Sequence, residues 1–202
     1  MKTIYLASKS PRRKELLRQV GIAFELLPLR VLPHDRRDVD ETPLQDEAAL
    51  DYVRRIAHLK AQAAVRIMVT RHLQRRLVLA ADTTVVLHGA ILGKPADAAD
   101  AVNMLKRLSG QTHEVHTAIA VANSKDVQSA VSSSTVTFRQ LDEKEIRQYV
   151  ATGEPLDKAG AYAIQGRAAA FISHLSGSYS GVMGLPLYET VRLLQDFETP
   201  AL

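Results

Sequence analysis

The sequence predicts a mixed α/β fold, and three patterns indicate it. The nearly continuous apolar run from Leu77 to Leu87 is typical of a strand that is buried on both faces. Between Asp46 and Val69, apolar residues recur at spacings of three and four, which is the period of an amphipathic helix. Two strand-like segments, Glu114 to Ala122 and Gln128 to Phe138, flank a short polar turn, as in a hairpin. Helices interspersed with strands, some of them antiparallel, favour an α/β or α+β fold with a mixed sheet.

The N-terminal segment predicts a strand followed by a helix. Lys2 to Ala7 has the composition of a first strand. Ser10 is a suitable N-cap residue and Pro11 is favoured at the first helical position, so we expect a helix over Arg12 to Val20. Gly21 suits the left-handed position at which such a helix ends.

The next part of the chain alternates strands, loops and helices. Phe24 to Leu27 is a short predicted strand. Prolines and charged residues dominate Pro28 to Asp46, for which we expect a mobile loop. Asp97 is expected to cap a helix that ends near Leu108, with Gly110 as its stop.

The C-terminal part predicts two more helices and one more strand. Asp142 followed by Glu145 resembles a capping box that opens a helix. Ala168 to His174 is a predicted strand, and the glycine-rich segment Gly177 to Gly184 is a predicted loop. This loop leads into a final helix over Pro186 to Asp196.

The composition is that of a soluble globular protein. The 202 residues, 46% hydrophobic and 24% charged, suffice for one domain. Cysteine is absent, which excludes disulfides and thiolate metal sites and fits a cytoplasmic location. No membrane partner is expected, because no apolar stretch approaches the roughly 18 to 20 residues of a membrane helix. The net charge of +4 either suits an anionic ligand or reflects a mixed surface with slightly more arginine. Aromatic residues are only 5%, so nucleic acid is not an expected partner.

Two charged residues interrupt apolar patterns. Asp82 lies within the predicted buried strand, where an unpaired carboxylate is costly to desolvate. In a functional interpretation, Asp82 binds a metal or acts as a base toward water. In a structural interpretation, it bonds local backbone or an arginine. Lys60 lies within the apolar stripe of the predicted long helix. Its ammonium group either points into a cleft and neutralises a phosphate, or extends past the core into water.

An anion site is predicted where the first strand meets the first helix. Backbone N–H groups and the helix dipole attract anions at a helix N-terminus. The side chains of Ser8, Arg12 and Arg13 add donors suited to phosphate oxygens, although a capped helix with exposed arginines is the alternative. Lys94, on a turn, and the small-residue segment Asp157 to Gly166 are weaker candidates for ligand contacts.

Seven segments follow one another from about Ile4 to Leu194. They are LASKSPRRKELL, VRRIAHLKA, AADTTVV, LGKP, MLKRLSGQTHEVHTA, EPLDKAGAYAIQG and SYSGVMGLP. Their joint occurrence in order is far more specific than any one of them, and together they resemble the Maf family of nucleotide pyrophosphatases.

The resemblance implies a mixed α/β fold in which two lobes surround a central cleft along an elongated, curved mixed sheet flanked by helices. It implies a single domain over residues 1–202 and a homodimer. It also implies that water attacks the α-phosphate of a nucleoside triphosphate and releases pyrophosphate, with a divalent cation, Mg²⁺ or Mn²⁺, as cofactor.

The resemblance also assigns roles to individual residues. The general base of the family falls on Asp82, and Glu41 joins Asp82 as a metal ligand. The other residues implied in catalysis or substrate binding are Lys60, Lys94, Ser8 and Arg13.

The substrate implied by the resemblance is a pyrimidine nucleotide. Arg12, Thr83 and Gln165 resemble the branch that acts on dTTP and UTP, and Thr83 and Gln165 are expected to read the base. One alternative is a nucleotide-binding regulator of septum formation, which needs no turnover. The other is an enzyme for 7-methyl-GTP, whose branch differs at Thr83 and Gln165.

Overall fold

The computed structural model describes residues 2–29 and 38–198. Its strands are β1 (Ile4–Leu6), β2 (Phe24–Leu26), β3 (Val78–Leu87), β4 (Ala90–Leu92), β5 (Thr112–Ala122), β6 (Val127–Phe138) and β7 (Ile172–Ser176). Its α-helices are α1 (Pro11–Gln19), α2 (Ala49–Thr70), α3 (Ala98–Leu108), α4 (Glu143–Val150), α5 (Tyr179–Met183) and α6 (Leu187–Glu198). Three short 3₁₀ helices, η1 (Glu154–Asp157), η2 (Ala159–Ala161) and η3 (Arg167–Phe171), lie between α4 and β7.

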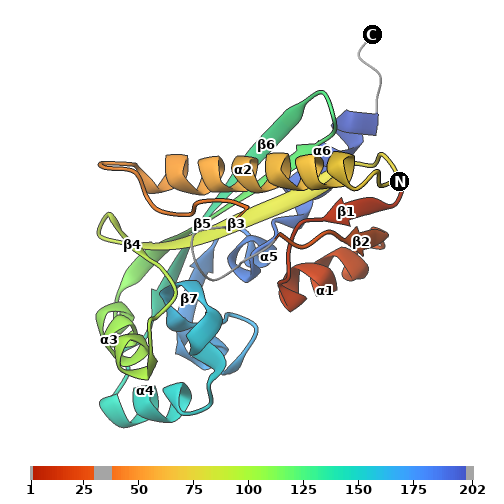
Figure 1. Cartoon of the computed structure of the whole chain (residues 1–202). Coiled ribbons are helices and arrows are strands. Elements are labelled where there is room, and N and C mark those ends of the chain that lie inside the picture. The colour runs from red at the N-terminus through yellow and green to blue at the C-terminus, as the bar shows by residue number, and fades with distance from the viewer. Residues whose placement is uncertain (1, 30–37, 199–202) are drawn as a thin grey trace. The chain divides into compact units, whose positions relative to one another are not determined.

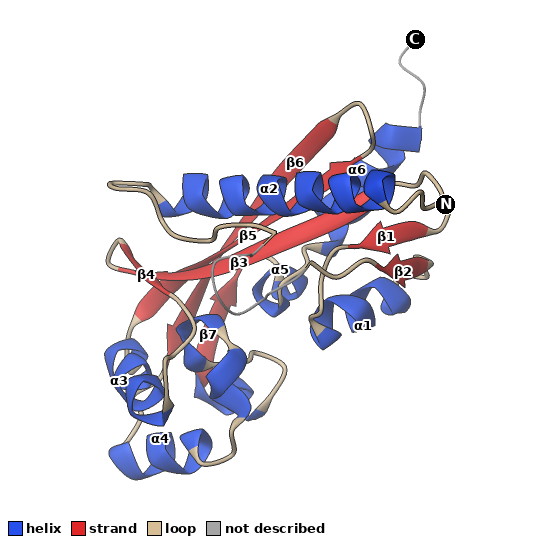
Figure 2. Cartoon of the chain, in the orientation of Figure 1, coloured by secondary structure: helices blue, strands red, loops and turns tan. Residues whose placement is uncertain are grey.

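The seven strands form one mixed sheet. Its order is β2-β1-β3-β5-β6-β7, and β4 pairs with β3 outside this path (Figure 2). By its contacts the chain divides into two compact units. Unit 1 contains the described residues up to Asp82, Thr117–Val131 and the described residues from Gly184 onward, and unit 2 contains Thr83–His116 and Ser132–Met183.

In unit 1, a long helix packs closely on parallel strands. β1 pairs in parallel with both β2 and β3. The 22-residue helix α2 lies along the strands (Figure 1) and buries Val53, Met68 and a row of alanines. Alanines also face it from the sheet, because Ala80 of β3 and Ala118 of β5 belong to the same core cluster. Small side chains on both surfaces let the helix backbone approach the sheet, which shortens the distance between side chains of α2 and β3.

In unit 2, antiparallel pairing and aromatic packing dominate. β4 pairs antiparallel with β3, and β7 pairs antiparallel with β6, with a register shift between Thr137 and Phe138. The rings of His113, Tyr162 and Phe138 pack edge to face at centroid distances of 4.9 to 5.4 Å. Edge-to-face geometry is the preferred arrangement of aromatic neighbours. This cluster holds the small-residue segment Asp157 to Gly166, which carries Tyr162, against β5 and β6.

Most of the elements predicted from the sequence are confirmed. Asp97 caps α3 by accepting a hydrogen bond from the Asp100 N–H at 2.8 Å. Asp142 caps α4 in the same way through the Glu145 N–H, also at 2.8 Å. The hairpin turn before β6 is closed by a hydrogen bond of 3.0 Å from the Asn123 N–H to the Asp126 carbonyl.

Some expectations at element ends were wrong. Ser10 occupies the N-cap position of α1, but its side chain makes no capping hydrogen bond there. Asp46 adopts a left-handed conformation, and the long helix begins only at Ala49. Leu50, an apolar residue of the predicted helix, is 42% exposed, because it lies in the first turn.

The C-terminal half also departs from expectation. The predicted strand Ala168–His174 begins as the 3₁₀ helix η3 and becomes a strand only at Ile172. The predicted glycine-rich loop contains the short helix α5. The strand β4 was missed, because three residues carry too little pattern to be recognised.

Two expectations concern other parts of the chain. Residues 30–37 of the predicted mobile loop lie outside the described residues, and Asp38–Asp46 contain no helix or strand. Across the described ranges, no helix has both the length and the apolar character needed to cross a membrane.

The turn at Gly160 gives a prediction about stability. Gly160 has φ +67°, and a Cβ atom there would lie 2.9 Å from Cγ1 of Val85. Gly153 is also left-handed, at φ +75°, but a Cβ atom there would meet nothing within 4 Å. We expect Gly153→Ala to lower the free energy of unfolding by about 1 kcal/mol through backbone strain. Gly160→Ala should cost about 2 to 4 kcal/mol, because overpacking adds to the strain.

Urea unfolding of both variants measures the difference. The urea midpoint should fall further for Gly160→Ala than for Gly153→Ala, with similar slopes for the two transitions. Equal midpoints would contradict the tight packing of Gly160 on Val85.

Candidate functional site

The candidate site in unit 1 is built around one ammonium group between two carboxylates. Lys60 Nζ lies 2.7 Å from Asp82 Oδ1 and 3.1 Å from Glu41 Oε1. The side chains of Lys60 and Asp82 are only 15% and 13% exposed, whereas that of Glu41 is 45% exposed. We call these three residues the Lys60 cluster. Ion pairs with so little water around them are screened much less than pairs on an open surface.

The local structure explains why Lys60 and Asp82 meet. Asp82 lies on β3 and Lys60 on α2, and the alanine-lined contact brings the two elements close together. The ammonium group does not extend past the core into water, as the alternative interpretation required, but ends at the two carboxylates. Asp82 likewise bonds the ammonium group of Lys60. Each charge therefore offsets much of the other's desolvation cost.

Arg13 and Ser8 form a second group of donors in unit 1. Arg13 Nε donates to the Gly184 carbonyl at 2.7 Å, and Arg13 Nη1 donates to Ser8 Oγ at 3.2 Å. Ser8 Oγ also accepts a hydrogen bond of 3.2 Å from the backbone N–H of Ser10. The guanidinium group is therefore held in a fixed orientation beside the N-terminus of α1.

The electrostatics connect Arg13 to the Lys60 cluster. Burial lowers the pKa of Arg13 from its ordinary value, and Arg12 lowers it as well. Asp82 and Glu41 oppose this shift of the pKa, because their negative charges favour the charged guanidinium group. Arg13 and Lys60 thus lie near the two carboxylates, and Arg12 adds a third positive charge beside Arg13, an excess of positive charge that suits a polyphosphate.

Three further residues hold the segment that carries Glu41. The Tyr52 hydroxyl donates to the Glu41 carbonyl at 3.1 Å. Arg55 Nη2 donates to the Thr42 carbonyl at 3.1 Å, and Arg55 also binds both oxygens of Glu47 at 2.6 Å. Burial, followed by the charges of Asp82 and Glu41, raises the pKa of Tyr52 to about 12.

Sequence reasoning missed these three positioning residues. Tyr52 and Lys60 are eight positions apart, so they fall on one side of a helix, and this spacing was the available signal. A tyrosine at helical spacing is nevertheless more often a core residue than a functional one. Glu47 and Arg55 are eight positions apart across a helix start, for which no spacing rule exists.

The chemistry of the cluster suits a hard cation. Two carboxylate oxygens, Glu41 Oε1 and Asp82 Oδ1, converge on one point, which the ammonium group of Lys60 occupies. Carboxylate oxygens are the ligands that Mg²⁺ prefers, and Mg²⁺ usually takes only one or two of them together with water and substrate phosphates. Residues 2–29 and 38–198 contain no group of three or more His, Cys, Asp or Glu side chains that could hold a metal.

The other predicted site residues belong to unit 2, where Gly160 links their segments. Gly160 donates a hydrogen bond of 3.0 Å to the carbonyl of Gly93, the neighbour of Lys94. Gly160 also packs on Val85, which lies two positions after Thr83 along β3. Side chains two positions apart on a strand point to the same face. Thr83 therefore lies on the face of β3 that this glycine covers.

Lys94 and Gln165 themselves are exposed. Gln165 follows four buried residues, Ala161 to Ile164, and precedes the half-buried Gly166. Its side chain is thus presented to solvent by a backbone that is anchored in the core of unit 2.

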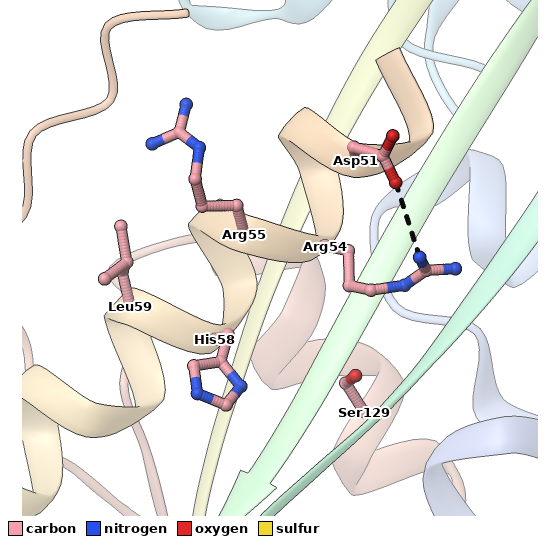
Figure 3. A pocket seen from close by; sticks show the side chains of 6 residues that line it. All are labelled: Asp51, Arg54, Arg55, His58, Leu59 and Ser129. Carbon is pink, nitrogen blue, oxygen red and sulfur yellow. Dashed lines mark ion pairs between the residues drawn. The ribbon is translucent and has the colours of Figure 1, made fainter. Parts of the chain in front are cut away.

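A separate hollow of about 290 Å³ lies beside α2 in unit 1 (Figure 3). None of the residues predicted for the site lines it. Its two arginines already have acidic partners, since Arg54 pairs with Asp51 at 3.5 Å and Arg55 with Glu47. We therefore do not place the functional site in this hollow. Its lining residues are Asp51, Arg54, Arg55, His58, Leu59 and Ser129.

Comparison with curated proteins finds close relatives that span the whole chain. A protein of Aromatoleum aromaticum named dTTP/UTP pyrophosphatase is 56% identical over 198 residues, covering 98% of this chain and 96% of the relative. Proteins with the same name from Dechloromonas aromatica and Nitrosospira multiformis are 52% and 55% identical. These alignments cover 95% and 96% of this chain, and 96% and 93% of the respective relatives.

The solved structures add a likeness in fold. The Ham1 protein of Staphylococcus aureus superposes with a TM-score of 0.50 at 16% identity, covering 98% of both chains. At this identity the likeness concerns the fold alone. The sequence profile described as Maf-like protein matches residues 3–197. The match extends over nearly the full length, and relatives that are more than half identical support it, so the chain belongs to the Maf family.

Proposed function

We propose that this protein hydrolyses nucleoside triphosphates, dTTP and UTP among them, to the nucleoside monophosphate and pyrophosphate. The observation that carries the proposal is the Lys60 cluster, in which a carboxylate on a buried strand is held by an ammonium group. Relatives at 52 to 56% identity that are named dTTP/UTP pyrophosphatase support both the reaction and the substrates.

The reaction is a displacement at the α-phosphorus. The oxygen of a water molecule forms a bond to the α-phosphorus, and the bond from that phosphorus to the α–β bridging oxygen breaks. Pyrophosphate leaves with the bridging oxygen. Asp82 accepts the proton of the attacking water, and a positioned general base of this kind typically contributes a factor of about 10² to 10⁴.

Cationic side chains stabilise the charge that develops on the phosphates. Lys60 and Arg13 are oriented by the contacts described above, and Arg12 adds a third charge. Lys94 is proposed to bind the triphosphate as well, as the family resemblance implies. Fixed cations in a site of low water content stabilise a transition state without reorganising, and in many enzymes this stabilisation accounts for most of the rate enhancement.

Glu41 and Asp82 would hold a divalent cation, Mg²⁺ or Mn²⁺. Bound there, the cation would neutralise phosphate charge and polarise the attacked phosphorus. Lys60 contacts one oxygen of each carboxylate, so the second oxygen of Asp82 and that of Glu41 would be the ones offered to a metal. Because the local balance of charge is already positive, we propose that the metal arrives together with the negatively charged nucleotide.

Thr83 and Gln165 are proposed to read the base through hydrogen bonds. A wrong base would leave a polar group of the site without its partner, which costs about 1 to 3 kcal/mol. The cytoplasmic location, the single domain over residues 1–202 and the homodimer implied by the family resemblance stay predictions.

A nucleotide panel tests the proposed activity. Purified protein with Mg²⁺ or Mn²⁺ should release pyrophosphate from dTTP and UTP faster than from 7-methyl-GTP or from purine triphosphates. Enzyme-coupled detection of pyrophosphate measures the rates. If neither dTTP nor UTP gave pyrophosphate with either metal, the proposed function would be wrong, and the nucleotide-binding regulator would be favoured.

Substitution of Asp82 tests its role as the base. We expect Asp82→Asn to lower kcat for dTTP by a factor on the order of 10² to 10⁴, because the amide does not accept the proton of water. Binding of an unhydrolysable dUTP analogue with an α,β-imido bridge, measured by calorimetry, should survive. Asp51→Asn is the matched control, since Asp51 also lies in unit 1 and pairs with a cation, Arg54. Wild-type turnover in Asp82→Asn would contradict the assignment.

Removal of the ammonium group tests how the metal binds. Without nucleotide, Lys60→Met should bind Mn²⁺ at least about tenfold more tightly than the parent, because a unit charge close to the metal site is lost. Turnover should fall in the same variant, since the cation no longer faces the phosphates. Mn²⁺ titration followed by electron paramagnetic resonance measures the affinity directly. Lys106→Met, which removes a lysine paired with Glu143 at 3.1 Å, should leave it unchanged.

If Lys60→Met bound free Mn²⁺ no better than the parent, Glu41 and Asp82 would not be the metal ligands. The nucleotide panel would remain unaffected by that outcome.

A further inference from the structure

In unit 2, a carboxylate lies directly over the backbone next to Gln165. Gly166 has no side chain, and a Cβ atom built there would overlap both carboxylate oxygens of Glu154. The N–H of the next residue, Arg167, donates to Glu154 Oε2 at 3.3 Å. Only a glycine at position 166 allows the carboxylate to approach the chain this closely.

The carboxylate of Glu154 is itself held in place. Its Oε1 accepts a hydrogen bond of 2.9 Å from the hydroxyl of Tyr149, whose side chain is buried. The ring of Tyr149 packs edge to face on Phe171 at a centroid distance of 5.1 Å. The backbone carbonyl of Glu154 accepts a hydrogen bond of 3.0 Å from Lys158 Nζ. Glu154 therefore connects the aromatic core of unit 2 to the segment at Gly166.

Gln165 lies in a tight turn, and Glu154 contacts the C-terminal end of that turn. The Gly166 N–H donates to the Ala163 carbonyl at 3.0 Å, so residues 163–166 form a tight turn with Gln165 at its third position. The near end of the turn is fixed, because Ala163 is buried and the hydroxyl of Tyr162 bonds His113 Nε2 at 2.8 Å. The far end is fixed by Glu154 at Gly166.

We propose that Glu154 is a positioning residue that sets base selectivity by fixing the turn from which Gln165 projects. This inference rests on the proposed function, in which Gln165 reads the base. The amide of Gln165 offers an NH₂ group as donor and a carbonyl oxygen as acceptor, which complement the carbonyl and the adjacent N–H of a thymine or uracil ring. On a mobile turn, the amide of Gln165 would form hydrogen bonds with several bases equally well. A turn that is fixed at both ends limits the orientations of the amide, and so limits which bases it can hydrogen-bond.

Selectivity is the readout, because a purely structural residue would change stability and not the ratio between substrates. We expect Glu154→Ala to lower the ratio of kcat/KM for dTTP over kcat/KM for dCTP about tenfold, the effect of one badly oriented hydrogen bond. Glu154→Gln retains the shape and an acceptor for the Arg167 N–H, so it should keep the ratio within about threefold. Glu143→Ala is the matched control, because it removes an exposed, ion-paired glutamate of unit 2.

A double variant shows whether the effect passes through Gln165. In a Gln165→Ala background, Glu154→Ala should change the dTTP/dCTP ratio no further, since the group that it positions is gone. Gly166→Ala disrupts the contact between Glu154 and Gly166 by adding a Cβ atom where the carboxylate lies, so it should lower the dTTP/dCTP ratio as Glu154→Ala does. Gly166→Ala serves as the test if circular dichroism and the melting temperature show that Glu154→Ala does not fold.

The outcomes separate this inference from the proposed function. Parental selectivity in folded Glu154→Ala or Gly166→Ala, or an equal loss in the Gln165→Ala background, would overturn the role of Glu154 while leaving the activity intact. Absence of dTTP and UTP hydrolysis in the parent would overturn the proposed function itself.

Discussion

The ion pair between Lys60 and Asp82 is the interaction on which the rest of the site depends. Asp82 interrupts a strand whose other residues are almost all buried and apolar, so its charge needs a partner within the protein. Lys60 interrupts the apolar face of α2 and has the same need. Burying either charge without the other would be costly. In the pair, Lys60 binds only Oδ1 of Asp82, so the other carboxylate oxygen can contact a ligand. The two residues at the centre of the candidate site thus also offset the cost of each other's burial in the core.

The segment that carries Glu41 is held by hydrogen bonds from side chains of α2 to its backbone. Tyr52 and Arg55 of α2 donate to two successive carbonyl groups, those of Glu41 and Thr42. Glu47 in turn fixes Arg55 through both of its oxygens. The second carboxylate of the Lys60 cluster is therefore positioned by contacts to its backbone. Substitution of Glu41 itself would leave this support in place.

Much of the fold and part of the site could be predicted from the sequence, for physical reasons. The buried strand β3 and the helix α2 carry strong periodic patterns, and Asp82 and Lys60 stand out because they break those patterns. The caps of α3 and α4 follow from the chemistry of Asp97 and Asp142. The roles proposed for Glu41, Thr83 and Gln165 come from the family resemblance, because no spacing rule points to these residues.

The remaining features depend on contacts that a single sequence does not reveal. The strand β4 is three residues long, and its existence depends on the partner strand. Tyr52 has the appearance of an ordinary core residue. The approach of Glu154 to Gly166 joins two segments across several short turns, and no periodicity relates them. Such contacts are determined by tertiary packing, which overrides local preference.

The alanine-lined contact between α2 and the sheet has a consequence for how this protein tolerates change. Ala57, Ala61 and Ala64 are fully buried against small residues of the strands. A larger side chain at any of them would push the helix outward, and Lys60 on the same helix would move with it. The small alanine side chains between α2 and the sheet thus determine how close the ammonium group of Lys60 comes to β3. Residues outside the Lys60 cluster are in this way constrained in volume by the position that its ammonium group holds.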